Sequence, residues 1–130
     1  MAEPVGIVLV SHSESLAGGL RELLLQVSGS DVAVEAAGGT TDGRLGTSDE
    51  RIRAAIARAD RGGGVVVLTD LGSAVLTTLA VLAEPVREDV VLVDAPFVEG
   101  AVAAAVLAST GADLATVAAA AEEARSVPKF

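Results

Sequence analysis

His12 is the only histidine in the chain and the residue best suited to carry chemistry. A neutral imidazole nitrogen can attack a phosphoryl group when an acceptor holds the other ring nitrogen, fixes the tautomer and stabilises the cation that forms. His12 follows one apolar run, and a second apolar run ends in Asp70, whose carboxylate could be that acceptor. The two residues are therefore the candidate catalytic pair of a phosphoryl-transfer site.

The elements that must position this pair alternate between strands and helices. Apolar or alternating runs predict strands at 5–10, 32–36, 65–70 and 90–93. Helical spacing and start or stop signals predict helices at 16–27, 47–59, 71–83, 98–108 and 113–124. The alternation predicts a single doubly wound α/β domain over residues 1–130, with a four-stranded, mostly parallel sheet in the order 2-1-3-4 and helices on both faces.

This strand order places the catalytic pair in one crevice. Ligands of an open parallel sheet bind outside the carboxyl ends of the strands, where the winding reverses, and here that point lies between strands one and three. His12 and Asp70 leave those two strand ends. Ser11 and Glu14 have the spacing of a capping box, which would put His12 in the first turn of the next helix, where the macrodipole favours a phosphoryl dianion.

Backbone amides must supply most of the phosphate binding, because a helix terminus contributes only about 0.3–1 kcal/mol. Small residues in the loops after strands two and three allow close approach of phosphate oxygens. The candidate phosphate-binding residues are Gly38, Gly39, Thr40, Gly72 and Ser73. The hydroxyls of Thr41 and Thr47 could add further donors.

Each candidate also has an ordinary structural interpretation. His12 could be a partly exposed loop residue, and Asp70 could cap the helix that follows it. Gly39 and Gly72 could simply form turns, and Thr47 opens a T-x-x-E capping box before the second helix. The functional interpretation depends on the convergence of these residues on one crevice.

Composition excludes several other classes of protein. The chain has no cysteine and one histidine, so thiolate chemistry and Cys- or His-rich metal sites are excluded, and we expect neither metal nor cofactor. A net charge of −9 argues against a nucleic-acid partner. The apolar runs are too short to span a bilayer and the N-terminus has no basic region, so we expect a cytoplasmic protein that does not bind membranes.

Four motifs, in this order and over nearly the whole chain, resemble one known family, the phosphotransferase subunits of phosphoenolpyruvate-dependent dihydroxyacetone kinases. They are Val10-Ser11-His12-Ser13, Gly46-Thr47, Thr69-Asp70-Leu71-Gly72-Ser73-Ala74 and Ala95-Pro96-Phe97-Val98-Glu99-Gly100. The resemblance implies a fold like that of mannose-type EIIA, with His12 phosphorylated by the phosphocarrier HPr and Asp70 as the partner of the imidazole. It also implies that phospho-His12 rephosphorylates ADP held on the nucleotide-binding kinase subunit.

The same resemblance has implications for assembly. A separate subunit would bind dihydroxyacetone, and this chain would form a homodimer. Some family members continue into HPr-like and enzyme-I-like domains that the 130 residues do not include. We therefore expect other proteins to supply those domains.

The sequence also allows two alternative functions to be weighed against this one. An EIIA component of a mannose-type sugar transporter would use the same histidine chemistry, although the motif from Asp70 to Ala74 argues against it because the transporter branch usually has an aromatic residue and a second glycine there. A regulatory receiver or a nucleotide-binding domain is disfavoured. A receiver needs a lysine after a late strand, but the only lysine is Lys129, near the end of the chain. A dinucleotide-binding domain needs G-x-G-x-x-G after the first strand, and this motif is not present there.

Overall fold

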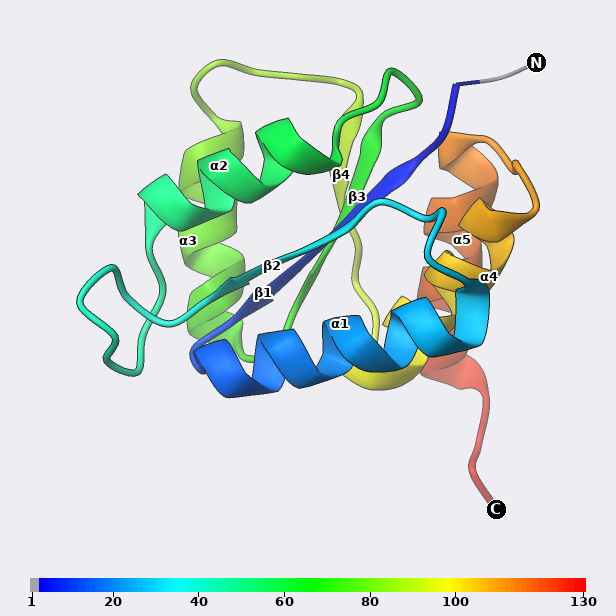
Figure 1. Cartoon of the computed structure of the whole chain (residues 1–130), viewed down its shortest axis with the longest axis horizontal. Coiled ribbons are helices and arrows are strands. Elements are labelled where there is room, and N and C mark those ends of the chain that lie inside the picture. The colour runs from blue at the N-terminus through cyan, green and yellow to red at the C-terminus, as the bar shows by residue number, and fades with distance from the viewer. Residues whose placement is uncertain (1–2) are drawn as a thin grey trace.

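The structure, a computed structural model, describes residues 3–130 and consists of parallel strands joined by helices (Figure 1). The strands are β1 (Gly6–Ser11), β2 (Val34–Gly38), β3 (Val65–Thr69) and β4 (Val90–Leu92). The α-helices are α1 (Glu14–Ser28), α2 (Asp49–Ala59), α3 (Gly72–Leu82), α4 (Phe97–Ser109) and α5 (Leu114–Glu123), and a 3-10 turn follows at Ala124–Ser126. The sheet order is β2-β1-β3-β4 with every pairing parallel, which confirms the predicted class and order.

Two apolar cores lie on opposite faces of this sheet, because successive side chains of a strand point to opposite sides. Ile7 and Leu9 of β1 pack with α1, α4 and α5, whereas Val8 and Val10 pack with α2 and α3. Figure 1 shows this division, with α1, α4 and α5 on one side of the strands and α2 and α3 on the other. The doubly wound arrangement therefore buries the central strand β1 on both faces.

The parallel register brings the two candidate catalytic residues together. Val10 of β1 lies opposite Thr69 of β3, so His12 and Asp70 leave adjacent strands at the same edge of the sheet. The amide of Asp70 donates to the carbonyl of Val10 at 3.1 Å, which continues the pairing one residue beyond β3. Strand pairing thus fixes the backbone on both sides of the site.

The start of α1 differs from the sequence prediction. The N-cap is Ser13, whose hydroxyl accepts from the amide of Leu16 at 3.2 Å, so the expectation of a cap at Ser11 with His12 in the first helical turn is wrong. The physical reason is that β1 continues through Ser11, which pairs with Gly38 of β2. His12 therefore lies in the two-residue connection between β1 and α1.

The start of α2 is also shifted. Its N-cap is Ser48, whose hydroxyl accepts from the amide of Arg51 at 3.2 Å, so the predicted cap at Thr47 is wrong by one residue. The hydroxyl of Thr47 instead contacts α3.

Within residues 3–130, the helices lack the combination of length and apolar composition that a bilayer crossing requires.

Candidate active site

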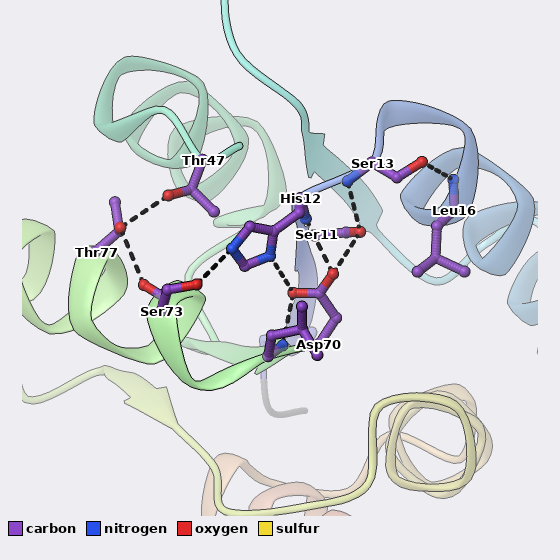
Figure 2. Close-up of polar contacts among 9 residues, drawn as sticks. Ser11, His12, Ser13, Leu16, Thr47, Asp70, Ser73 and Thr77 are labelled. Carbon is purple, nitrogen blue, oxygen red and sulfur yellow. Dashed lines mark hydrogen bonds and ion pairs between the residues drawn. The ribbon is translucent and has the colours of Figure 1, made fainter. Parts of the chain in front are cut away.

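The imidazole of His12 is oriented by the carboxylate of Asp70 (Figure 2). Nδ1 of His12 lies 2.9 Å from Oδ1 of Asp70. The side chain of His12 is 24% exposed and that of Asp70 is 10% exposed, so the carboxylate is shielded while the ring reaches solvent. The two residues predicted as the catalytic pair are therefore in direct contact at the carboxyl edge of the sheet.

The carboxylate of Asp70 accepts three further hydrogen bonds. The donors are the hydroxyl of Ser11 at 2.9 Å, the amide of His12 at 3.0 Å and the amide of Leu71 at 2.7 Å. Burial by itself raises the pKa of Asp70, but the hydrogen bonds from His12, Ser11 and Leu71 outweigh it, so the net effect is a lowered pKa. Asp70 is therefore an anion at neutral pH.

An ionised carboxylate can only accept hydrogen bonds, so Nδ1 of His12 carries the ring proton and Nε2 holds the lone pair. Nε2 lies 2.5 Å from the hydroxyl oxygen of Ser73, in the first turn of α3, and this hydroxyl must therefore be the donor. The amides of Gly72 and Ser73, at the start of α3, have no acceptor within their own helix. Nε2 thus lies beside the N-terminal turn of α3.

The alternative role of Asp70 as the cap of α3 is wrong. The N-cap of α3 is Leu71, which has no side-chain capping bond. At the start of this helix, the carboxylate of Asp70 accepts from the amide of Leu71 and not from the amides of the first helical turn. The carboxylate turns toward His12 because four donors converge on it from the end of β1 and its own turn. Its hydrogen bonds therefore organise the histidine rather than the helix.

The other candidate phosphate-binding residues lie at the end of β2 and directly after it. Gly38 is the last residue of β2, not a loop residue as expected, because β2 extends further than its alternating pattern. A Cβ at Gly38 would lie 2.5 Å from the carbonyl oxygen of Ser13, so glycine here makes room for the start of α1. Gly39 adopts a left-handed φ of 73°, and its amide donates to the carbonyl of Ser11 at 3.1 Å.

Other polar groups of the loop between β2 and α2 also form hydrogen bonds to groups of the protein. The amide of Thr40 donates to the carbonyl of Arg44 at 2.9 Å, and the hydroxyl of Thr40 bonds to Asp42 and accepts from the amide of Arg44. The amide of Gly46 donates to the carbonyl of His12 at 2.9 Å. The structure thus brings the hydroxyl of Ser73 to Nε2, with Gly72 next to it in sequence at the start of α3, whereas the amides of Gly39 and Thr40 donate to the carbonyls of Ser11 and Arg44. Phosphate binding by any of these candidates stays a prediction.

Two functional contacts were missed by the sequence analysis. The hydroxyl of Ser11 donates to Asp70 and accepts from the amide of Ser13, so it supports the carboxylate. Thr77 lies four residues after Ser73 on α3 and contacts both Ser73 and Thr47. Its spacing of one helical turn from Ser73 was a signal that could have drawn attention to it.

These features define a class of site, a histidine oriented by a largely shielded carboxylate at the carboxyl edge of a parallel sheet. The family model described as "PTS system fructose IIA component", EIIA-man, matches residues 6–118. The chain therefore belongs to the EIIA-man family.

The similar proteins are more specific than the family. The phosphoryl donor subunit DhaM of PEP-dependent dihydroxyacetone kinase 2 from Listeria innocua is 41% identical over 105 residues, covering 78% of this chain and 84% of that protein. The corresponding subunit of kinase 1 from the same organism is 37% identical over 105 residues, covering 81% and 82%. The resemblance to this family of phosphotransferase subunits is confirmed.

One solved structure extends the likeness to the whole fold. The crystal structure of the unknown function protein EF1359 superposes with a TM-score of 0.84 at 34% identity, covering 98% of both chains. This likeness between the two structures confirms the predicted α/β fold.

Proposed function

We propose that this chain is the phosphoryl donor subunit of a phosphoenolpyruvate-dependent dihydroxyacetone kinase. In this role His12 accepts a phosphoryl group from HPr and passes it to ADP bound on the nucleotide-binding kinase subunit. The observation that carries the proposal is the contact of 2.9 Å between Nδ1 of His12 and Asp70, which leaves the lone pair on Nε2. The DhaM names of the similar proteins support the choice of phosphoryl acceptor.

The transfer proceeds by two displacements at phosphorus. The lone pair of Nε2 attacks the phosphoryl group of phospho-HPr, the N–P bond of the donor breaks, and the bonding pair returns to the donor imidazole. His12 keeps its proton on Nδ1, so the phosphorylated ring is cationic and Asp70 stabilises that charge. A β-phosphate oxygen of ADP then attacks phosphorus, the bond to Nε2 breaks, and its electron pair returns to His12.

Gly72 and Ser73 receive the phosphoryl oxygens in this proposal. Their amides begin α3, where a helix macrodipole favours negative charge, and the hydroxyl of Ser73 lies 2.5 Å from Nε2. When the N–P bond forms, this hydroxyl exchanges its bond to Nε2 for a phosphoryl oxygen. Gly39 and Thr40 contribute indirectly, by ordering the loop whose Gly46 amide holds the carbonyl of His12.

We also propose that two copies of the chain form a homodimer. Leu71, Leu76 and Leu79 are 60%, 70% and 51% exposed, and they lie at the start and along the outer side of α3. This helix covers β3 and β4, and β4 is an edge strand of the sheet. A second copy would bury these leucines, and analytical ultracentrifugation of the wild type and of Leu76→Asp tests this assembly: a monomeric wild type contradicts it.

Reconstitution tests the phosphoryl transfer. Incubation with phosphoenolpyruvate, enzyme I and HPr should give an acid-labile phosphoprotein. We place this chain in the cytoplasm, together with enzyme I and HPr. His12→Ala should remove the label, since no other histidine is present. An Ala variant that still accepts phosphate would show that His12 is not the acceptor.

A second step separates the kinase role from that of a sugar-transporter EIIA. The phosphorylated protein is mixed with the ADP-loaded kinase subunit and, in a parallel reaction, with an EIIB protein of a mannose-type transporter. We expect ATP to form in the first mixture and the label to stay on His12 in the second. Transfer to EIIB alone would favour the transporter function instead.

A further inference from the structure

A chain of hydroxyl groups connects the loop before α2 to the first turn of α3. Oγ1 of Thr47 lies 2.8 Å from Oγ1 of Thr77, which in turn lies 3.2 Å from the carbonyl oxygen of Ser73 (Figure 2). Thr47 precedes the cap of α2, and Thr77 is one turn beyond Ser73 on α3. The chain thus bridges two elements that flank His12.

The direction of these hydrogen bonds follows from proton counting. A carbonyl oxygen can only accept, so Thr77 donates its single hydroxyl proton to Ser73. Thr77 must therefore accept in its other bond, and Thr47 is the donor. The proton of Thr47 is therefore directed at Thr77 in this structure, and phosphate binding by Thr47 stays a prediction.

The same residues close a ring of contacts around His12. The amide of Gly46, next to Thr47, donates to the carbonyl of His12 at 2.9 Å. The hydroxyl of Ser73 donates to Nε2 of His12 at 2.5 Å. The carbonyl of His12 is therefore held next to Thr47, and its imidazole is held by Ser73, at the other end of the same series of hydrogen bonds. These contacts fix the position of Ser73 relative to the imidazole.

We propose that Thr77, with Thr47 as its donor, is a positioning residue that keeps the hydroxyl of Ser73 on Nε2 of His12. Without the Thr77 hydroxyl, the first turn of α3 loses its tie to the loop that holds His12, and Ser73 is free to turn away from the ring. Nε2 then bonds to water instead. The consequence for phosphoryl uptake rests on the proposed function, whereas the consequence for the ring does not.

Substitutions at Thr77 test this role by imidazole 15N resonances of the unphosphorylated protein and by the rate of phosphoryl uptake from phospho-HPr. We expect Thr77→Val to shift the Nε2 resonance and to lower the uptake rate about fivefold, which corresponds to roughly 1 kcal/mol, with the KM for the donor unchanged. Thr77→Ser should restore both. Thr110→Val is the matched control, because Thr110, the C-cap of α4, also donates its hydroxyl proton to a carbonyl of the preceding helix, that of Leu107 at 2.6 Å.

The outcomes separate a positioning role from a structural one. If Thr77→Val lowers the melting temperature but leaves the Nε2 resonance and uptake rate at wild-type values, the proposal is overturned. If that variant does not fold, Thr47→Val removes the donor alone, and an unchanged Nε2 resonance there equally overturns it. Failure of the proposed function is distinguishable, since the wild type itself would then take up no phosphoryl group.

Discussion

The turn between β3 and α3 and the loop between β2 and α2 flank the same histidine but use their backbone differently. In the short turn, Gly72 and Ser73 begin a helix, and their amides have no acceptor in that helix. In the longer loop, the amides of Gly39, Thr40 and Gly46 donate to carbonyl oxygens of the protein. The amides of Gly72 and Ser73 are therefore the ones that the proposed function assigns to a phosphoryl group on Nε2.

The difference lies in the hydrogen bonds that the two segments already make, not in their content of small residues. Both segments have small residues at their start, and both were predicted to bind phosphate for that reason. What distinguishes them is whether the amides are already used. Gly38 is small because α1 packs against it, and a Cβ there would lie 2.7 Å from Cα of Glu14, whereas a Cβ at Gly72 would meet no atom within 4 Å.

The largest expected effect comes from Asp70, the residue that orients the imidazole flanked by the two segments. Asp70→Asn removes the charge that stabilises the phosphorylated ring, and it lets an amide group present a donor to Nδ1, which disturbs the tautomer. We expect phosphoryl uptake to fall by about 10²–10³-fold, measured by rapid-quench labelling. Circular dichroism provides the control for folding, and an uptake rate within twofold of wild type would contradict the role of Asp70.

Two glycine substitutions probe the comparison directly. Gly38→Ala forces its Cβ against the backbone of Ser13 and should reduce the free energy of unfolding by about 1–3 kcal/mol, measured by denaturant titration. Gly72→Ala should leave that free energy nearly unchanged, because the added methyl group enters open space, but it should slow phosphoryl uptake. A Gly38→Ala variant with wild-type stability but slow uptake, together with a Gly72→Ala variant with wild-type uptake, would contradict the comparison.

Hydroxyl deletion sharpens the same contrast. Ser73→Ala removes the donor to Nε2 and to the phosphoryl group, so uptake should fall by about tenfold, which corresponds to roughly 1.4 kcal/mol. Thr40→Val removes a hydroxyl that bonds to Asp42 and Arg44 within the loop and should have a smaller effect. Equal losses in the two variants, measured in one stopped-flow assay, would remove the distinction between the segments.

The smallest expected effect is on acid stability. The pKa of Asp70 is lowered in the folded protein from a reference value of 3.8, so its hydrogen bonds to His12, Ser11 and Leu71 stabilise the fold in full above that value. This contribution is lost as the pH falls through the folded pKa, because protonation of the carboxylate then favours the unfolded chain. The difference in melting temperature between wild type and Asp70→Asn should therefore shrink below pH 3.8; a constant difference would contradict the assignment.

Local sequence was sufficient for the strand order and for the contact between the two candidate catalytic residues. Apolar runs that end in Ser11 and in Asp70 indicate buried parallel strands, and parallel strands necessarily deliver their carboxyl ends to one edge. The contact between His12 and Asp70 follows from that topology. Its prediction required only the apolar pattern and the handedness of the connections, both of which the sequence carries.

Tertiary structure alone decided which amides stay free, where helices start and which hydroxyls meet. The pairing of Ser11 with Gly38 extends β1 and β2, which moves the cap of α1 to Ser13 and puts Gly38 inside the sheet. The contact of Thr47 with Thr77 joins residues 30 positions apart, and neither local propensity nor spacing encodes it. Such contacts depend on how two helices lie against each other, and that is set by the packing of the whole core.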